Sequence, residues 1–303
     1  MSDPAARKAP SVSLYRRALW HANRTPLAWA VKGAMSAFHL REKAARREAA
    51  APYRQGQAVS RPLSQLASEG YAFVTELAEP ALLRELEHES LARVRRAEEL
   101  ARAQATTHKA FWVRLLDADV QDGAFDCDNI FVRFALQKGV IALLSEYLGE
   151  LPRLMDVLLT YSLPTDEPLA YSQLWHRDYD DVRTVKLFAY LTDVNELADG
   201  PFTFLKGPSS DRVGFARRSH LADEEFFRRA PRDGVAEVRA PRLSAFVCET
   251  SRCYHMGSRV HAGHARLMYT ATFISSPNVY PEGPPRFRAS RPLAPAERLL
   301  LGL

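Results

Sequence analysis

The sequence predicts an α+β protein that is mainly β, with an N-terminal layer of helices followed by a β-rich half that closes as a sandwich or barrel. Three observations predict this class. Helix-type segments dominate before residue 150, many short β-type runs follow it, and turn residues separate those runs. Long helices do not alternate with the strands, so a doubly wound sheet is excluded.

Four segments of the first half have helical patterns: 42–51, 63–69, 80–103 and 138–148. Gly70 and Gly149 each follow one of them, and glycine is a usual stop after a helix. Pro80 stands where proline commonly begins a helix, ahead of a leucine stripe. Two further segments, 71–77 and 126–134, are rich in aromatic and β-branched residues and are expected to contain strands.

Seven short β-type runs follow: 157–162, 173–176, 184–192, 202–205, 235–239, 244–250 and 266–274. A charged insertion, residues 211–231, interrupts them and is expected to form a helix or a lid. Residues 277–295 are proline-rich and expected to be irregular, with a short helix at 299–301. The chain therefore divides into a basic arm (1–60), one domain (61–276) and a proline-rich C-terminal extension (277–303).

The arm carries the positive charge. Residues 1–60 contain eleven Lys or Arg and three Asp or Glu, a net charge of +8, so the rest carries −3 of the chain's +5. Aromatic and aliphatic residues alternate with the basic ones in 14–38, where Pro26 would interrupt a single helix. A stretch of this kind packs against its own domain, lies on an anionic membrane, or binds nucleic acid. No nucleic-acid motif accompanies the charge, so packing is favoured, membrane contact comes second and nucleic acid is not expected.

Cysteine usage and the N-terminus predict a cytoplasmic protein, with peripheral membrane contact as the addition that the arm suggests. The three cysteines are Cys127, Cys248 and Cys253, none in a CxxC pair, which argues against a disulfide framework. The first residues lack the apolar region of a secretory signal, and no run of eighteen apolar residues occurs.

The segment 173–178, Gln-Leu-Trp-His-Arg-Asp, carries the first candidate for chemistry. In a strand, residues two apart face the same side, so His176 and Asp178 would point together. A second histidine would complete a 2-His-1-carboxylate face, which suits a non-haem Fe(II) oxygenase because open positions remain on the metal.

Three later histidines compete for the third position: His255, His261 and His264. An arginine on the following strand could bind the far carboxylate of a keto acid through two hydrogen bonds. Arg266 lies eleven residues after His255, whereas the same step from the other two histidines reaches uncharged residues. His255 is therefore favoured.

These residues resemble the phytanoyl-CoA dioxygenase-like branch of the Fe(II)/2-oxoglutarate oxygenases over residues 63–276. The resemblance rests on five features: Trp-His-Arg-Asp at 175–178, the segment 188–194, Asp-Gly-Pro within 199–209, Tyr-His-Met-Gly at 254–257, and Arg266. The chain departs from the family after Asp-Gly-Pro, where Gly-Pro-Ser is not followed by the histidine that the family often has.

The resemblance implies a double-stranded β-helix, the cupin-like jelly-roll. It implies His176, Asp178 and His255 as ligands of Fe(II), and Arg266 as the anchor of the co-substrate 2-oxoglutarate. The implied activity is an O₂-dependent hydroxylation of a small-molecule or lipid-linked substrate, with succinate and CO₂ as co-products. The alternative from another class is a metal-binding jelly-roll protein without oxygenase activity.

Four further residues are weaker candidates. Lys186 and Tyr190 alternate on one expected strand, and both could face the cavity, with Lys186 pairing with a carboxylate and Tyr190 hydrogen-bonding to one. The alternative for Lys186 is a solvated strand face. Tyr161 and Gln173 are candidate polar groups on the substrate side.

Overall fold

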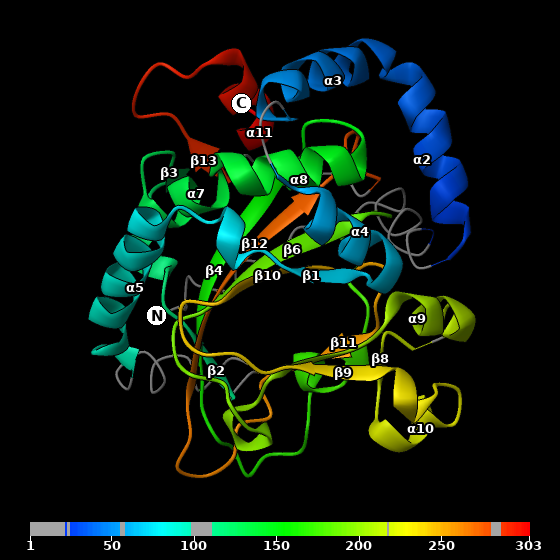
Figure 1. Ribbon diagram of the computed structural model, residues 1–303, viewed down its shortest axis with the longest axis vertical. Helices are drawn as coiled ribbons and strands as arrows, with labels where there is room; N and C mark the ends of the chain where they lie inside the picture. The colour runs from blue at the N-terminus through cyan, green and yellow to red at the C-terminus, as the bar shows by residue number, and fades with distance from the viewer. Residues whose placement is uncertain (1–21, 23–24, 55–57, 98–110, 217, 280–285) are drawn as a thin grey trace, which may run out of the picture.

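The computed structural model describes residues 22, 25–54, 58–97, 111–216, 218–279 and 286–303. Two antiparallel sheets face each other, and helices cover their outer sides (Figure 1). The six-stranded sheet has the order β1 (Tyr71–Phe73), β10 (Ala245–Glu249), β6 (Thr184–Tyr190), β12 (Arg266–Ile274), β4 (Arg153–Ser162) and β2 (Trp112–Arg114). The five-stranded sheet has the order β8 (His220–Leu221), β5 (Trp175–His176), β11 (His255–Met256), β7 (Phe202–Leu205) and β9 (Val235–Val238).

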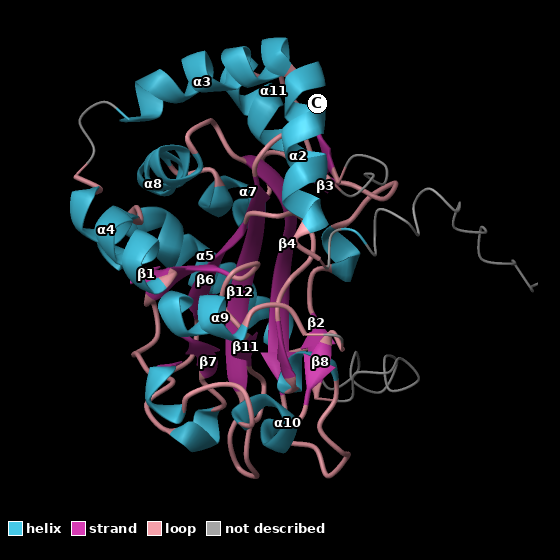
Figure 2. Ribbon diagram, turned by 90° about the vertical axis from the view of Figure 1, so that its right-hand side faces the viewer, coloured by secondary structure: helices cyan, strands magenta, loops and turns pink. Residues whose placement is uncertain are grey.

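The described helices are α2 (Leu27–Phe38), α3 (Leu40–Arg54), α4 (Ser60–Glu69), α5 (Pro80–Val94), α7 (Ile130–Ala135), α8 (Lys138–Leu148), α9 (Gly207–Val213), α10 (Asp223–Phe227) and α11 (Pro295–Leu301). Figure 2 shows that α3, α8 and α11 gather at the end of the molecule opposite α10. A short parallel pair joins β3 (Phe125–Asp126) to β13 (Phe287–Arg288). No described helix is long and apolar enough to cross a membrane.

Strand alternation separates the two faces of the six-stranded sheet. On β6, Leu187 and Ala189 belong to the core beneath the helices, whereas Phe188 and Tyr190 belong to an aromatic cluster between the sheets. Phe188 packs on Phe202 of β7 with ring centroids 4.7 Å apart, which joins the sheets face to face. Side chains two apart on a strand share a face, so Lys186 also points between the sheets.

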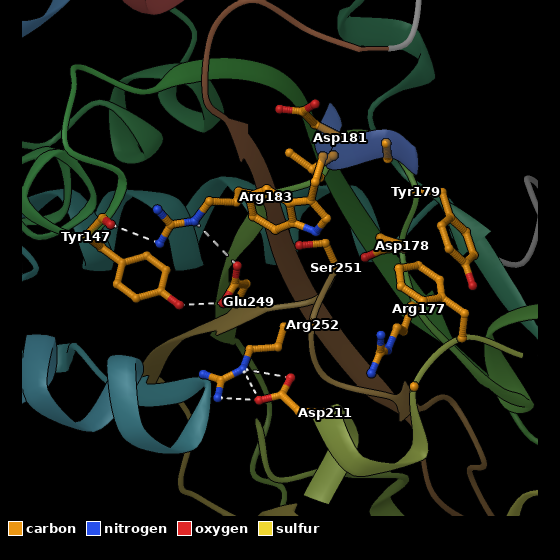
Figure 3. Close-up of a pocket in the computed structure, with 15 residues that line it drawn as sticks. Tyr147, Arg177, Asp178, Tyr179, Asp181, Arg183, Asp211, Glu249, Ser251 and Arg252 are labelled. Atoms are coloured by element: carbon orange, nitrogen blue, oxygen red, sulfur yellow. Dashed lines mark hydrogen bonds and ion pairs between the residues drawn. The ribbon is translucent and has the colours of Figure 1, made fainter. Parts of the chain in front are cut away.

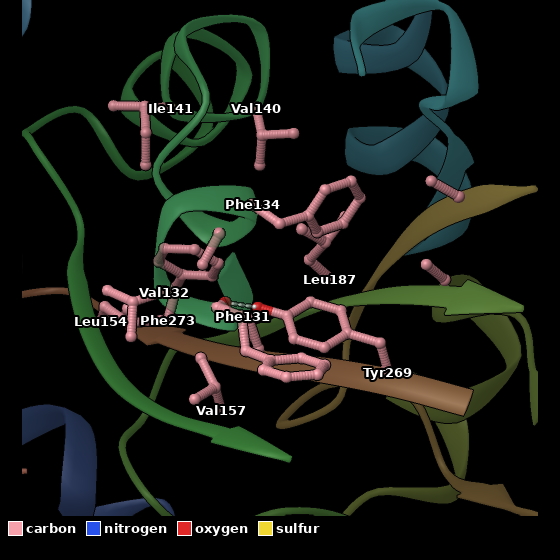
Figure 4. Packing of buried hydrophobic residues seen from close by; sticks show 14 of the residues in the cluster. Phe131, Val132, Phe134, Val140, Ile141, Leu154, Val157, Leu187, Tyr269 and Phe273 are labelled. Carbon is pink, nitrogen blue, oxygen red and sulfur yellow. Dashed lines mark hydrogen bonds between the residues drawn. The ribbon is translucent and has the colours of Figure 1, made fainter. Parts of the chain in front are cut away.

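The main core lies between the six-stranded sheet and the helices. Figure 4 shows the α7 and α8 side chains over Leu187, Tyr269 and Phe273, with the Tyr269 hydroxyl donating to the Phe131 carbonyl. Tyr269 stacks edge-on against Phe134 at 5.3 Å. This layer fixes the outer face of β6 and β12 and so holds their inner side chains in place.

The described part of the arm packs on this body. Arg46 on α3 is 2 % exposed and donates to the carbonyls of Leu151 and Leu299. Lys43 lies 2.7 Å from Glu150. On α2, the Lys32 ammonium lies 2.5 Å from the Asp181 carboxylate, three residues beyond Asp178. Residues 27–54 are therefore tied to the fold by buried charges.

Most predicted elements of the second half have the predicted position, and β7 and β12 have the predicted bounds. In the first half, α8 ends at Gly149 as predicted, and α4 ends at Gly70. Gly70 has φ +79°, and a Cβ there would lie 2.3 Å from the Cys253 sulfur. The glycine that ends α4 therefore also lets the chain pass close to the turn between β10 and β11.

Several predictions need correction. The strand predicted over 126–134 is wrong: β3 ends at Asp126, and Ile130–Ala135 forms α7, because the Asn129 side chain accepts the Phe131 N–H and caps a helix. The strand predicted over 71–77 ends at Phe73 and continues as one 3₁₀ turn. The helix predicted over 80–103 ends at Val94, and residues 98–103 lie outside the described part. Residues 287–288, expected to be irregular, form β13.

Candidate metal centre

Two histidines on neighbouring strands of the five-stranded sheet face each other. His176 on β5 pairs directly with His255 on β11, and their ring centroids lie 4.2 Å apart. Together with Asp178 they offer three ligand atoms, all within 4.8 Å of one another. Residues 79 positions apart in sequence meet here because antiparallel pairing places them side by side.

Each histidine is oriented by its own backbone. His176 Nδ1 lies 2.8 Å from the Leu174 carbonyl, and His255 Nδ1 lies 3.0 Å from the Cys253 carbonyl. A carbonyl accepts only, so each Nδ1 carries the proton and each Nε2 has its lone pair free. This arrangement fixes the tautomer that a metal requires.

Asp178 reaches the site from beyond the strand. β5 ends at His176, so simple strand parity does not place this carboxylate; instead the Asp178 N–H donates to the Thr250 carbonyl at 3.0 Å. Its Oδ2 lies 3.7 Å from His255 Nε2 and 2.8 Å from Lys186 Nζ. That buried oxygen is therefore already paired with one cation, the Lys186 ammonium, and a metal ion could take the place of that ammonium.

The charge states suit a metal. Burial and the neighbouring His255 lower the pKa of His176 to about 3, and burial also lowers the pKa of His255. Burial alone would raise the pKa of Asp178, but Lys186, His255 and His176 together outweigh burial and lower that pKa below its ordinary value. Two neutral imidazoles and one carboxylate result, the protonation states in which these groups bind metals.

Arg266 is a buried cation without an anionic partner. It is 1 % exposed, at the start of β12, and Nη2 donates to Ser258 Oγ at 2.7 Å and Ser162 Oγ at 3.3 Å. Nη1 donates to the Gly200 carbonyl, and Nε has no partner. Among the described residues no carboxylate pairs with this guanidinium. Burial lowers its pKa, which reflects the same missing counter-charge.

Two cavities reach the three ligands. The smaller cavity, about 110 Å³, is lined by His176, His255, Lys186 and Arg266. The larger cavity, about 470 Å³, is lined by Asp178 together with residues from α2, α8 and the segments after β5, α9 and β10. The two histidines therefore line the smaller cavity, which also has two cations in its wall, and Asp178 lines the larger cavity.

The weaker candidates have different positions. Lys186 lines the smaller cavity, paired with Asp178, and its pKa is raised because the Asp178 and Asp180 charges outweigh burial. The Tyr190 hydroxyl donates to the Val238 carbonyl and accepts the Phe202 N–H, so its hydrogen-bonding capacity goes to backbone groups. Burial raises the pKa of Tyr190 to about 12. The Gln173 amide also bonds to backbone, at Ala170 and Ser258, and Tyr161 lines neither cavity.

The two competing histidines lie elsewhere. His264 Nδ1 pairs with Asp199 at 2.8 Å in a separate, partly exposed cluster with Glu196. His261 donates its backbone N–H to Ala198, and its side chain is exposed. Neither joins His176 and Asp178.

Sequence reasoning missed the groups that surround Arg266. Ser162 and Ser258 supply hydroxyls to the guanidinium, and Gly200, at φ +67°, turns its carbonyl toward it. The Asp-Gly-Pro turn at 199–201 was a visible signal for the last of these. Ser162 stands opposite Arg266 in the β4–β12 register, which strand pairing alone reveals.

The site has the donor set of a 2-His-1-carboxylate metal centre, with the free Nε2 atoms and the Asp178 carboxylate, here paired with Lys186, in place to hold a divalent ion. Such a centre leaves coordination positions open for exogenous ligands. The smaller cavity provides space and positive charge for an anion next to it.

No protein-family model matches this sequence, and no curated protein matches it. Solved structures do share the fold. The crystal structure of the epimerase SnoN in complex with Fe3+, α-ketoglutarate and nogalamycin RO has a TM-score of 0.51 and 16 % identity, over 74 % of this chain and 86 % of that one. EctD from S. alaskensis with 2-oxoglutarate and 5-hydroxyectoine has a TM-score of 0.52 and 13 % identity, over 72 % and 77 %. At these identities the likeness establishes a common fold for the two sheets and their helices.

Proposed function

We propose that this chain is an Fe(II)- and 2-oxoglutarate-dependent oxygenase with the double-stranded β-helix of the phytanoyl-CoA dioxygenase-like branch. Its reaction would hydroxylate a small-molecule or lipid-linked substrate. The observation that carries the proposal is Arg266, a buried guanidinium without a carboxylate partner among the described residues, in the same cavity as both candidate histidine ligands.

The three ligands would hold iron on one face. His176 and His255 would bind through Nε2, since each Nδ1 is held by a carbonyl, and Asp178 through Oδ2. When bound, the iron and 2-oxoglutarate supply the oxidising chemistry: 2-oxoglutarate, O₂ and a substrate C–H bond yield succinate, CO₂ and the C–OH product. The protein's own groups orient the co-substrate and the substrate.

Arg266 would take the far carboxylate of 2-oxoglutarate. A carboxylate there would accept hydrogen bonds from the guanidinium and from the hydroxyls of Ser258 and Ser162. These hydroxyl oxygens lie 2.7 and 3.3 Å from Nη2. Lys186 provides the second cation of the cavity, and metal binding to Asp178 would release its ammonium toward the co-substrate. Tyr190 would act by positioning, because its hydroxyl joins β6 to β7 and β9.

The two solved structures support this proposal. One holds Fe3+ with α-ketoglutarate and the other 2-oxoglutarate, and both share this chain's fold with TM-scores above one half. The donor set and the buried arginine of this chain support the proposal independently of that likeness.

The test is the addition of Fe(II) and then 2-oxoglutarate without oxygen. We expect a weak visible absorption band that requires both, and succinate once air is admitted. His176→Ala should abolish both signals, whereas His88→Ala, a histidine whose side chain is 82 % exposed, should leave both unchanged. Metal binding without band or succinate would instead identify a metal-binding jelly-roll protein without oxygenase activity.

Peripheral membrane contact through residues 14–38 is proposed as a second property. Of this segment the structure describes residues 22 and 25–38. Leu27 and Phe38, at the two ends of α2, are 65 % and 88 % exposed, and α2 carries no acidic side chain. Exposed apolar residues on a helix within a basic arm suit an anionic lipid surface.

A further inference from the structure

The larger cavity has a wall that the first 60 residues help to build. Trp29 from α2 and Phe215 beyond α9 line it. Tyr147 from α8 lines it as well (Figure 3). Asp178 lines the same space. The cavity therefore reaches the candidate metal centre at Asp178, whereas Arg266 lines only the smaller of the two cavities.

Three acidic side chains in this wall are already neutralised. Asp211 accepts three hydrogen bonds from Arg252, the shortest at 2.7 Å. Asp181 pairs with Lys32 at 2.5 Å. Glu249 accepts the Tyr147 hydroxyl and lies 3.6 Å from Arg183. These pairs need no external partner, and Figure 3 shows two of them at the left and lower part of the cavity.

Arg177 is different. It is 7 % exposed, and its guanidinium lies 4.5 Å from the Tyr254 ring and 5.7 Å from the Phe215 ring. Nη2 donates to the Ser210 carbonyl at 2.6 Å, but Nε is buried without a partner. Among the described residues no carboxylate pairs with Arg177. A buried cation that lines a cavity and lacks a counter-charge favours an anion in that cavity.

We propose that the larger cavity binds the primary substrate and that Arg177 holds an anionic group of it, a carboxylate or a phosphate. This inference rests on the proposed function. The aromatic rings of Trp29 and Phe215 add flat apolar surfaces, so the substrate class is an organic acid or phosphate ester with a planar or cyclic body.

The position of Arg177 suits this role. It stands between His176 and Asp178 in the chain, while its side chain is directed toward α9, away from the candidate ligand atoms. A substrate held there would lie beside the Asp178 face of the metal centre and would leave the smaller cavity to 2-oxoglutarate. Two cavities lined by different members of one ligand set would hold the two reactants close to each other in a fixed orientation.

The test uses phenyl phosphate and benzoate as probes, with phenol and benzamide as neutral counterparts. The protein is loaded with Mn(II) and 2-oxoglutarate so that Arg266 is occupied. An anionic probe at ten times its Kd should raise the thermal midpoint by about 3 °C, and the neutral counterparts should not. Arg177→Met should weaken the binding by at least about 30-fold, and Arg177→Lys should retain part of it.

A second pair of variants avoids the buried core. Trp29 is 54 % exposed, so Trp29→Ala should fold and should weaken phenyl phosphate more than inorganic phosphate. Leu27, 65 % exposed on α2, lies outside the cavity wall, so Leu27→Ala should change the binding of neither probe.

The proposal is overturned if neutral and anionic probes shift the midpoint equally, if neither anion shifts it, or if Arg177→Met binds them as the wild type does. Anion binding lost in Arg266→Gln but kept in Arg177→Met would place the anion in the smaller cavity and also overturn it. Failure of the proposed function is separate: the wild type would then give no visible band with Fe(II) and 2-oxoglutarate, whatever the probes do.

Discussion

Lys186 and Asp178 form an ion pair across the space between the two sheets, with Nζ 2.8 Å from Oδ2. The Lys186 ammonium supplies the positive charge next to Asp178 that a bound metal ion would otherwise supply. Lys186→Met should destabilise the metal-free protein by about 3 kcal/mol, since it leaves a largely buried carboxylate without its counter-charge.

Saturating Mn(II) should restore most of that loss, so the metal-induced rise in thermal midpoint should be larger in Lys186→Met than in the wild type. Scanning calorimetry with and without Mn(II) measures both. An equal metal-induced rise in the two proteins would contradict this reading of the pair.

Arg266→Gln should weaken 2-oxoglutarate binding by roughly 30-fold or more, because truncation of a buried charge partner costs about 2–5 kcal/mol. Titration of the visible band with 2-oxoglutarate gives the affinity. Arg266→Lys should recover part of it, since the charge returns without the two-pronged geometry. Iron binding itself, measured by equilibrium dialysis, should be unchanged, and a joint loss of iron would indicate a role in folding instead.

Lys32→Met should destabilise the protein by about 3 kcal/mol, because Asp181 is 1 % exposed and would lose its cation. Asp181 also accepts the Val279 N–H, so the loss would reach the segment after β12. The double variant Lys32→Met/Asp181→Asn should be less destabilised than the sum of the two single ones. Urea unfolding of the four proteins gives the coupling, and simple additivity would rule it out.

Asp223 begins α10 and accepts two hydrogen bonds from Arg259, at 2.7 and 2.8 Å, and one from Trp175 Nε1. The hydrogen bonds from Arg259 lower the pKa of Asp223 below its ordinary 3.8. The stabilisation of the folded protein by the charged Asp223 carboxylate is therefore fully present above pH 3.8 and is lost as the pH falls through the lowered pKa. Thermal midpoints of wild type and Asp223→Asn should differ by a constant amount from pH 7 to about pH 5 and converge below about pH 4. A gap that persisted in acid would show that the carboxylate charge is not responsible.

Phe38→Glu and Leu27→Glu should reduce sedimentation with vesicles that contain anionic lipid, because both residues are exposed on α2. Point variants are preferable to removing residues 1–60, which would also take away Lys32 and Arg46. Leu169→Glu, a change at an exposed leucine outside the arm, is the matched control. Unchanged sedimentation of both α2 variants would remove the membrane proposal.

Local sequence patterns predicted many of the strands and helices. The β-type runs bounded by turn residues predicted β6 and β12, whose outer residues meet helices and whose inner residues meet the opposite sheet. The same rules failed at Ile130–Ala135, where all but Arg133 are buried, so periodicity cannot separate a short helix from a strand. The deciding feature was a single cap, Asn129.

The candidate site was partly within reach of the sequence for a similar reason. The spacing between His255 and Arg266 spans one loop and the start of the next strand, so the sequence alone could indicate that the two residues belong to one site. The sequence could not indicate that Trp29 and Arg177 line one cavity, since that cavity is formed by segments almost 150 residues apart. The charge balance around Arg177 becomes visible only when the partners of every neighbouring carboxylate are known.

The two cavities draw on different parts of the architecture. Paired strands supply most of the smaller one, whereas helices and connecting segments supply most of the larger one. Exchanges of Trp29 or Phe215 should therefore change which acids the proposed substrate cavity binds, without touching hydrogen-bonded strands. The same division makes α2 part of the larger cavity, so a shortened version of the protein meant to keep that cavity should begin before α2 and not at the first strand.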